Sequence, residues 1–329
     1  MTLPPGDLES GLQRLYFHSS ERMPELPAAS VDVIITSPPY NRGKHYHPSY
    51  SDRLLPEEYE RLLSRVFREC HRVLRPRGSF FLNVGDSARD QGKSERVVRV
   101  AEEAGFRRVQ TLVWVKSILG KGHYTPSGRG RNFSNIFEYV YLLARGPSPR
   151  IDVLRVGIPY ADKSNIGRYS ARDLRDAGNV WFIPYRETTG ARRKKGHEAP
   201  FPVELPWRAL RCVPGARRIL DPFAGTGSTL AAAESLGIEG VGYERFPDPM
   251  VLRERLQTPY PFAPTVLLPE LERAVRLLAR LLEARPGGLG TALQEVPPQA
   301  RGEVRSLLER LGESPTASRR AGRPRPPKD

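Results

Sequence analysis

The pattern of apolar and polar positions predicts a chain in which strands and helices alternate. Short apolar runs typical of buried strands end at proline, glycine or polar residues. These runs are residues 15–17, 31–36, 79–84, 108–115, 136–144, 218–221 and 238–244. Apolar residues at helical spacing predict helices over 56–74, 94–104, 201–213 and 228–236. This alternation indicates an α/β fold, with a mostly parallel sheet covered by helices on both faces.

The pattern changes beyond about residue 262. Residues 267–284 and 300–311 have the periodicity of amphipathic helices, and Pro286–Gly288 separates them. Residues 314–329 are rich in proline, arginine and serine, a composition typical of disorder. The Gly322–Pro324 segment in this tail resembles a minor-groove AT-hook, and it fits a plain basic tail equally well. We therefore expect a helical extension over 263–313 and a disordered basic tail over 314–329.

The charge balance predicts a polyanionic partner. The chain has 52 Lys and Arg residues against 37 Asp and Glu, a net charge of +15. Such an excess favours phosphate contacts, although a GC-rich genome would also raise the arginine content. The excess is concentrated in residues 145–196, which have more than twice as many basic as acidic residues and few apolar runs besides Val180–Ile183.

Other classes of protein fit the composition poorly. Two cysteines and six scattered histidines form neither a disulfide framework nor a zinc motif, so we expect no metal. No run approaches the roughly 18 apolar residues of a membrane span, and Met1–Pro5 does not begin a secretory signal. The expected location is therefore the cytoplasm.

A glycine-containing loop between the strand 218–221 and the helix 228–236 is suited to a nucleoside cofactor. Gly225 and Gly227 allow tight turns and close approach of the backbone to a ligand. The helix start at Ser228 offers free N–H groups to a carboxylate such as that of a methionine moiety. The loop is too short for a dinucleotide fingerprint and has no P-loop lysine. Glu244, which ends the next strand, is placed to accept the two ribose hydroxyls.

A second loop, Ser37–Tyr40, follows the buried strand 31–36 and suits methylation of an amine. The exocyclic amine of a base is a poor nucleophile because its lone pair is delocalised into the ring. Acceptors such as the Ser37 hydroxyl and the Pro38 carbonyl would favour a pyramidal nitrogen whose lone pair faces a methyl sulfonium. The Tyr40 ring would stack on a base that has left the duplex. In isolation, the same residues fit a proline-rich turn.

With both loops in place, residues 12–250 resemble the amino-methyltransferases of bacterial DNA modification systems, in the permuted arrangement called the β class. Further similar segments are Arg72–Ser79, Trp114–Lys116 and His197–Pro202. The resemblance implies a seven-stranded, Rossmann-like, circularly permuted sheet that binds S-adenosylmethionine. It implies a catalytic half over 1–144 and a cofactor-binding half of the same domain over 197–262. The strand 15–17 should then lie beside the strand 238–244.

The resemblance also assigns roles to individual residues. The catalytic residues would be Ser37, Pro38, Pro39 and Tyr40. The cofactor-binding residues would be Ser19, Ser20, Pro200, Phe201, Pro202, Asp221, Phe223, Ala224, Gly225, Thr226, Gly227, Ser228, Thr229 and Glu244. One departure concerns the end of the strand 15–17, where the family usually has Gly-Asp and this chain has His18–Ser20. A serine hydroxyl would there replace the carboxylate that faces the adenine amino group.

The family's target-recognition region lies between the two halves, where this chain has its basic stretch 145–196. Double-stranded DNA is thus the expected partner, with a homodimer and a cognate restriction endonuclease left open. The expected DNA contacts are Arg129, Arg131, Arg168, Arg172, Arg192, Arg193, Lys194 and Lys195, with Lys121, His123 and Arg175 as further candidates.

The first residue of the Ser37–Tyr40 loop bears on which nitrogen is methylated. In the family, Ser-Pro-Pro-Tyr accompanies mainly cytosine N4 and Asp-Pro-Pro-Tyr mainly adenine N6. We therefore expect an N4-cytosine DNA methyltransferase, with N6-adenine as the alternative. Methylation of cytosine C5 needs an exposed cysteine nucleophile, and Cys70 and Cys212 fall within predicted helices. An RNA or protein amine methyltransferase and a DNA-binding protein without catalysis are further alternatives.

Overall fold

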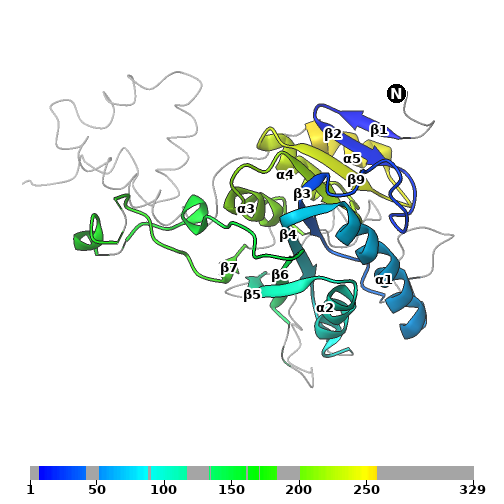
Figure 1. Cartoon of the computed structure of the whole chain (residues 1–329), viewed down its shortest axis with the longest axis horizontal. Coiled ribbons are helices and arrows are strands. Elements are labelled where there is room, and N and C mark those ends of the chain that lie inside the picture. Colours follow the sequence, from blue (N-terminus) through cyan, green and yellow to red (C-terminus); the bar gives the residue numbers. More distant parts are fainter. Residues whose placement is uncertain are drawn as a thin grey trace, which may run out of the picture. The chain divides into compact units, whose positions relative to one another are not determined.

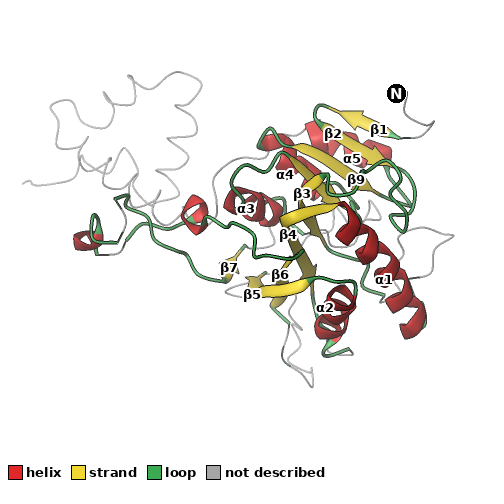
Figure 2. Cartoon of the chain, in the orientation of Figure 1, coloured by secondary structure: helices red, strands yellow, loops and turns green. Residues whose placement is uncertain are grey.

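The computed structural model describes residues 7–41, 52–87, 90–116, 133, 135–160, 162–169, 171–183 and 201–257. All of them belong to one unit, Met1–Phe262. Its elements, in chain order, are β1 (Leu8–Ser10), β2 (Gln13–Tyr16), β3 (Val31–Thr36), α1 (Pro56–Val73), β4 (Leu74–Val84), α2 (Lys93–Glu103), β5 (Arg107–Val115), β6 (Phe137–Ala144), the 3₁₀ turns η1 (Val153–Val156) and η2 (Lys163–Asn165), β7 (Val180–Phe182), α3 (Glu204–Cys212), β8 (Arg218–Asp221), α4 (Ser228–Ser235), β9 (Glu239–Tyr243) and α5 (Pro249–Gln257) (Figures 1 and 2). The predicted helices 267–284 and 300–311 and the basic tail 314–329 lie outside the described residues.

The described strands form a single sheet of nine in the order β1-β2-β9-β8-β3-β4-β6-β5-β7. Strands β2, β9, β8, β3 and β4 run parallel to one another, while β6 runs antiparallel to both of its neighbours. Strand β2 pairs with β9, with Leu15 opposite Gly242. The circular permutation predicts this pairing, because it places the strand 15–17 beside the strand 238–244 of the cofactor-binding half.

Seven of these strands correspond to the predicted apolar runs, and β1 and β7 are short additions at the two edges. Strand β1 folds back onto β2 through a turn at Gly11, where φ is +58°. Strand β7 pairs with β5 and comes from the basic stretch 145–196. At least this part of the basic stretch is therefore built into the sheet.

Helices cover both faces of the sheet, which explains the apolar strand sequences. Helices α1 and α2 pack on one face, with Phe67 of α1 against Phe80 of β4. Helices α3, α4 and α5 pack on the other face, where Phe81 of β4 is buried. Neighbouring residues of one strand thus point into two different cores. Each such buried side chain contributes about 1.5–3 kcal/mol.

The boundary between α1 and β4 differs from the prediction. The predicted helix 56–74 and strand 79–84 leave residues 75–78, which include Pro76 and Gly78, between them, yet β4 begins at Leu74, directly after α1. The pairing of β3 with β4 shifts register in this region, and Arg77 has a φ of +65°. The irregular start of β4 thus accommodates the proline without interrupting the strand.

The connections that leave β3 and β8 run in opposite directions along the sheet. Strand β3 continues through α1 to β4, and β8 continues through α4 to β9 on the other side. Because β3 and β8 are neighbours, they form a topological switch point, where open α/β sheets bind ligands at the carboxyl ends of their strands. Thr36 ends β3 and Asp221 ends β8. The two loops identified in the sequence therefore leave the sheet side by side.

Candidate active site

Side chains from α1 and α2 hold the Ser37–Tyr40 loop at the end of β3. The Tyr59 hydroxyl donates to the Pro39 carbonyl at 2.7 Å, and the Lys93 ammonium donates to the Tyr40 carbonyl at 2.5 Å. Lys93 is only 5% exposed and also pairs with the carboxylate of Asp90 at 2.9 Å. The backbone after Pro38 is therefore tied to the two helices that cover this face of the sheet.

The acceptors expected to face the amino group lie at the start of the same loop. Ser37 is half-buried and Pro38 is buried. Within the described part of the chain, no donor contacts the Pro38 carbonyl, whereas the next two carbonyls are both engaged. Among these three carbonyls, that of Pro38 is therefore the one left to accept from a ligand, and its role towards the amino group stays a prediction.

A buried polar cluster lies beneath this loop and consists of Tyr40, Asn83, Lys116 and Glu138. The Tyr40 hydroxyl donates to Glu138 Oε2 at 2.7 Å and accepts from Ser37 Oγ at 3.2 Å. Asn83 Nδ2 donates to the same Glu138 oxygen at 2.7 Å, and Lys116 Nζ pairs with Glu138 Oε1 at 2.9 Å. These four side chains are at most 9% exposed. The loop is therefore connected to an ion pair formed by the ends of β5 and β6.

Glu138 is ionised in this cluster. Burial by itself would raise the pKa of Glu138, but the Lys116 ammonium and the hydrogen bonds from Lys116, Tyr40 and Asn83 outweigh it and hold that pKa below its ordinary value. A buried carboxylate that is both paired and fully hydrogen-bonded can stay charged without the full cost of desolvation.

Neither Asn83 nor Glu138 was predicted as a site residue, and Lys116 was noted only as the last residue of the Trp114–Lys116 segment that is similar to the family. A signal was present in the sequence, since Glu138 is the one charged residue of the apolar strand β6. Asn83 likewise stands among apolar residues at the end of β4, between Leu82 and Val84. Lone polar residues in buried strands are costly unless they are satisfied, so their presence in such strands indicates candidate site residues.

The loop between β8 and α4 makes the sharp turns that its glycines predict. Gly225 and Gly227 have φ angles of +53° and +79°, in the region that favours glycine. The Gly225 N–H donates to Glu244 Oε2 at 2.8 Å, and Glu244 Oε1 accepts from the Phe246 N–H at 3.0 Å. Glu244 follows the last residue of β9 and thus lies beside the glycine loop.

The residues of this loop fit the S-adenosylmethionine that the resemblance implies. The hydroxyls of Thr226 and Ser228 are buried and have no hydrogen-bond partner among the described residues. A Cβ at Gly225 would meet no protein atom closer than 3.9 Å. The loop thus combines open space, buried hydroxyls that lack a partner among the described residues, and the N-terminus of α4. Gly225–Ser228 would hold the methionine end of the cofactor and Glu244 its ribose hydroxyls.

The other predicted residues of this loop support its conformation. The Ala224 N–H donates to the Tyr243 carbonyl at 2.9 Å, which joins the loop to the end of β9. Thr229 is fully buried in the first turn of α4, and Phe223 packs against the core on the α1 side of the sheet. These contacts fix the loop between β8, β9 and α4.

Asp221 connects this loop to β3. Its carboxylate is 1% exposed and accepts from Thr36 Oγ1 at 2.6 Å and from the Phe223 N–H at 3.1 Å. Burial raises the pKa of Asp221 to about 6, while these hydrogen bonds oppose the rise. The carboxylate is therefore a structural link between the two loops.

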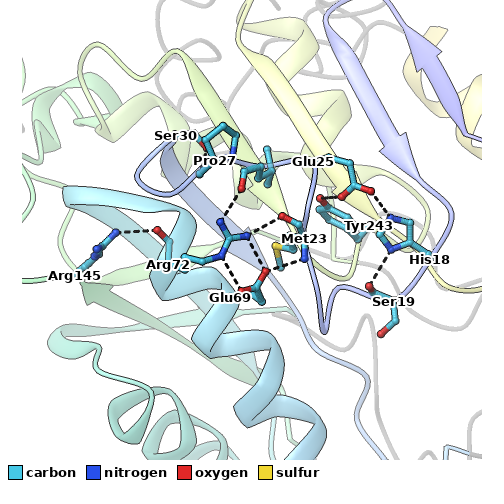
Figure 3. A network of polar contacts seen from close by, with 11 residues as sticks. His18, Ser19, Met23, Glu25, Pro27, Ser30, Glu69, Arg72, Arg145 and Tyr243 are labelled. Atoms are coloured by element: carbon cyan, nitrogen blue, oxygen red, sulfur yellow. Dashed lines mark hydrogen bonds and ion pairs between the residues drawn. The ribbon is translucent and has the colours of Figure 1, made fainter. Parts of the chain in front are cut away.

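The end of β2 is tied to the end of β9 by a polar network. Glu25 accepts from the Tyr243 hydroxyl at 2.8 Å and lies 2.9 Å from His18 Nε2 (Figure 3). Ser20 is buried, and Ser19 donates to Glu21 at 3.0 Å. A cavity of about 560 Å³ opens here, lined by His18, Ser19, Glu21, Arg22, Pro24, Glu25 and Arg65. Two carboxylates therefore line the cavity near the place where the family usually has its aspartate.

An arginine clamp holds the segment that follows β2. The Arg72 guanidinium of α1 donates to the carbonyls of Met23 and Leu26, each at 2.8 Å, and pairs with Glu69 at 2.8 Å (Figure 3). Glu69 in turn accepts from the Met23 N–H at 2.8 Å. The segment that lines the cavity is thus attached to α1.

The predicted segment before α3 is only partly described. Phe201 is 9% exposed and packs in the core on the α3 side of the sheet, and the Pro202 carbonyl accepts from the Leu205 N–H. Helix α3 begins at Glu204, three residues later than predicted. Pro200 lies outside the described residues. A cofactor contact from Phe201 and Pro202 stays a prediction.

Of the basic residues expected to contact DNA, Arg168, Arg172 and Arg175 are described, and all three are exposed. The Arg168 guanidinium lies over the ring of Tyr169, 5.4 Å from its centre, and the Tyr169 side chain is itself 72% exposed. The remaining expected contacts, Lys121, His123, Arg129, Arg131, Arg192, Arg193, Lys194 and Lys195, lie outside the described residues.

Neither cysteine is placed to act as a nucleophile. Cys70 of α1 and Cys212 of α3 are free and buried. Burial raises the pKa of Cys70 well above its ordinary value and that of Cys212 to about 12. Thiolates are therefore disfavoured at both positions. Elsewhere in the described residues, no three His, Cys, Asp or Glu side chains are grouped to hold a metal ion. None of the described helices is long and apolar enough to cross a membrane.

Comparison with known proteins places the chain in a family. A family model described as DNA methylase, for N6 and N4 methyltransferases, matches residues 31–248. The match includes both loops and the strands that carry them. The chain therefore belongs to the N6/N4 DNA methylase family, and it is a DNA amino-methyltransferase of the restriction-modification type.

Individual relatives agree with this assignment. The type II methyltransferase M.MthZI of Methanothermobacter thermautotrophicus is 27% identical over 267 residues, which are 70% of this chain and 72% of that protein. The TTHA0409 protein of Thermus thermophilus, solved in complex with S-adenosyl-L-methionine, gives a TM-score of 0.50 at 27% identity, and the match covers 74% of this chain and 93% of that chain. The cytosine-N4-specific PvuII DNA methyltransferase shares the fold, with a TM-score of 0.56 at 20% identity, and covers 76% and 88%.

Proposed function

We propose that this chain transfers the methyl group of S-adenosylmethionine to the exocyclic N4 of cytosine in a specific duplex DNA sequence. The single observation that carries the choice of cytosine is Ser37, a neutral hydroxyl at the first position of the loop that follows β3. Family members with serine at this position act mainly on cytosine N4, and those with aspartate act mainly on adenine N6.

The use of S-adenosylmethionine rests on the loop between β8 and α4 and on the Thermus thermophilus relative solved with that cofactor. Gly225–Ser228 offer backbone N–H groups, open space and buried hydroxyls, and Glu244 follows β9 beside them. When bound, S-adenosylmethionine supplies the electrophilic methyl group. The protein positions the amine in line with it.

The Ser37–Tyr40 loop would act on the base by hydrogen bonding and stacking. The Ser37 hydroxyl and the Pro38 carbonyl accept hydrogen bonds from the two N–H groups of the N4 amine, which directs the nitrogen lone pair towards the methyl group. The reaction then needs no covalent intermediate between protein and base. The amino group of a paired cytosine is out of reach inside the duplex, so the base is flipped out before the reaction.

The test is to identify the methylated nucleoside. The protein is incubated with unmethylated plasmid DNA and isotopically labelled S-adenosylmethionine, and the DNA is digested and analysed by mass spectrometry. We expect labelled N4-methylcytosine, and its loss in the Ser37→Ala variant. Labelled N6-methyladenine alone would overturn the choice of cytosine in favour of adenine. Absence of any label in DNA would overturn the proposed reaction altogether.

A further inference from the structure

The hydrogen bonds beneath the Ser37–Tyr40 loop form a chain with one direction. Ser37 Oγ donates to the Tyr40 hydroxyl at 3.2 Å, and the Tyr40 hydroxyl donates to Glu138 Oε2 at 2.7 Å. A hydroxyl has one proton to donate and two lone pairs that accept. The direction of each link therefore decides whether the next hydroxyl still has a proton to offer.

The carboxylate at the inner end sets this direction. An ionised carboxylate can only accept hydrogen bonds, so the Tyr40 proton must point towards Glu138. The Tyr40 oxygen is then left as an acceptor for the proton of Ser37. Asn83 Nδ2 is also a donor to the Tyr40 oxygen at 3.3 Å and, more weakly, to Ser37 Oγ at 3.5 Å. With its own proton used on Tyr40 and one lone pair facing Asn83, Ser37 Oγ has only a lone pair left to offer to a base.

Two neighbours keep Glu138 in the state that this direction requires. Lys116 pairs with its Oε1 at 2.9 Å, with both side chains about nine-tenths buried. Asn83 Nδ2 donates to Oε2 at 2.7 Å, so the donor side of this amide faces the carboxylate. Asn83 Oδ1, on the other side of the amide, is buried without a partner in the described part of the chain. That orientation is the one expected if Glu138 is an anion.

We propose that Glu138, with Lys116 as its counter-ion, is a positioning residue that acts through Tyr40 and makes Ser37 Oγ an obligate acceptor towards the target base. Such an acceptor favours a base that donates from an exocyclic amine and disfavours one that presents a carbonyl oxygen. The inference rests on the proposed function only in that the substrate is an exocyclic amine, and it applies to cytosine N4 and adenine N6 alike.

The test compares Glu138→Gln, Tyr40→Phe and the double variant with the wild type. A glutamine has nearly the same shape, but its amide can donate to Tyr40 and so reverse the chain. Phenylalanine keeps the ring and removes the link. We expect each single variant to lower the single-turnover methylation rate on unmethylated plasmid DNA roughly 10- to 100-fold, the size typical of losing a hydrogen bond to a charged group. The affinities for DNA and for S-adenosylmethionine should change less than about threefold.

The double variant distinguishes positioning from a general structural role. If Glu138 acts through Tyr40, the double variant is about as slow as either single variant. Multiplied effects would overturn the inference, as would unchanged rates in both single variants. Glu138→Gln also leaves the buried Lys116 ammonium without its counter-ion. The combined variant Glu138→Gln with Lys116→Met removes both charges, so it tests the loss of the Glu138 carboxylate without an unpaired ammonium. We expect the same fall in rate there, and a recovered rate would contradict the proposal.

A matched control keeps these outcomes separate from effects of stability. Asp32→Asn removes a carboxylate at the opposite end of β3, where it pairs with Arg75 and accepts from the N–H groups of Arg217 and Arg218. This variant should lower stability and leave the methylation rate within about twofold of the wild type.

The product made by the wild type distinguishes the failure of this proposal from the failure of the proposed function. Labelled adenine with slow variants overturns the cytosine assignment alone, while labelled cytosine with fast variants overturns the role of Glu138 alone.

Discussion

The hydroxyl of Thr36 donates a 2.6 Å hydrogen bond to the carboxylate of Asp221, across 185 positions of the chain. Both side chains are buried. Thr36 is the last residue of β3, before the loop proposed to hold the target amine, and Asp221 is the last residue of β8, before the loop that fits the cofactor. This hydrogen bond therefore links the ends of two neighbouring strands at the point where the two loops leave the sheet.

Replacing Thr36 by valine should loosen this link without changing the shape of the side chain. The Asp221 carboxylate loses a buried donor, so we expect the free energy of unfolding in urea to fall by about 1–3 kcal/mol. The two loops lose their fixed separation, so the single-turnover methylation rate should fall as well. Ser30→Ala is the control, since it removes an exposed hydrogen bond to the Pro27 carbonyl at the start of β3. Equal stability of the two variants would contradict this role of Thr36.

The raised pKa of Asp221 predicts how stability depends on pH. Folding raises this pKa from 3.8 to about 6, so between these values the folded state holds a proton that the unfolded chain releases. The contribution of this proton to stability is complete below about pH 4 and is lost as the pH rises through about 6. Asp221→Asn removes the titration, while its Oδ1 can still accept from Thr36 and from the Phe223 N–H.

The measurement is the free energy of unfolding of Asp221→Asn minus that of the wild type at several pH values. We expect this difference to move in favour of the variant by about 2–3 kcal/mol between pH 4 and pH 7, at about 1.4 kcal/mol for each unit of the pKa shift. Other titrating groups cancel in the difference, because both proteins share them. A difference that stays constant over this range would show that the pKa of Asp221 is not raised by folding.

Much of the fold was predictable because buried parallel strands are short, continuous apolar runs. The residues of β3 and β8 illustrate this, since they are buried along most of their length and end at prolines that cannot continue a ladder. Strand β7 has only three residues, and its pairing with β5 depends on contacts that no local pattern encodes. For the same reason β1 was not predicted.

The parts of the candidate site that lie in one loop could be predicted from the sequence motif of that loop. The parts that are assembled from distant strands could not. Ser37 and Gly225 stand in recognisable loops, and the structure brings those loops to neighbouring strands. Glu138 and Asn83 meet because β6 pairs antiparallel with β4, with Val140 opposite Asn83, so Glu138 lies on the same face two residues away. Such a register is a tertiary property, which explains why the ion pair beneath Tyr40 was missed.

Substitution of Gly225 tests whether the cofactor occupies the open space beside this residue. Gly225 and Gly237 both have positive φ, at +53° and +65°, and a Cβ at either would meet no protein atom closer than 3.9 Å. Alanine at either position should therefore cost about the same stability, roughly 1 kcal/mol of backbone strain. Only Gly225→Ala should weaken the binding of S-adenosylmethionine, by about tenfold or more in isothermal titration. Equal affinity in both variants would place the cofactor away from Gly225.

Substitution of Arg168 tests whether the exposed part of the basic stretch contacts the DNA backbone. Its guanidinium is exposed over the ring of Tyr169 and is free to approach a phosphate. If it neutralises one phosphate, Arg168→Ala should weaken DNA binding at low salt and reduce the slope of log affinity against log salt concentration by about 0.9. Arg107→Ala makes the same change in charge at the start of β5. This position lies at the end of the strands opposite the carboxyl ends that carry the site, so the slope should stay unchanged. The same slope for Arg168→Ala and the wild type would mean that DNA does not reach this part of the stretch, and the recognition surface would then have to be formed by other basic residues of the chain.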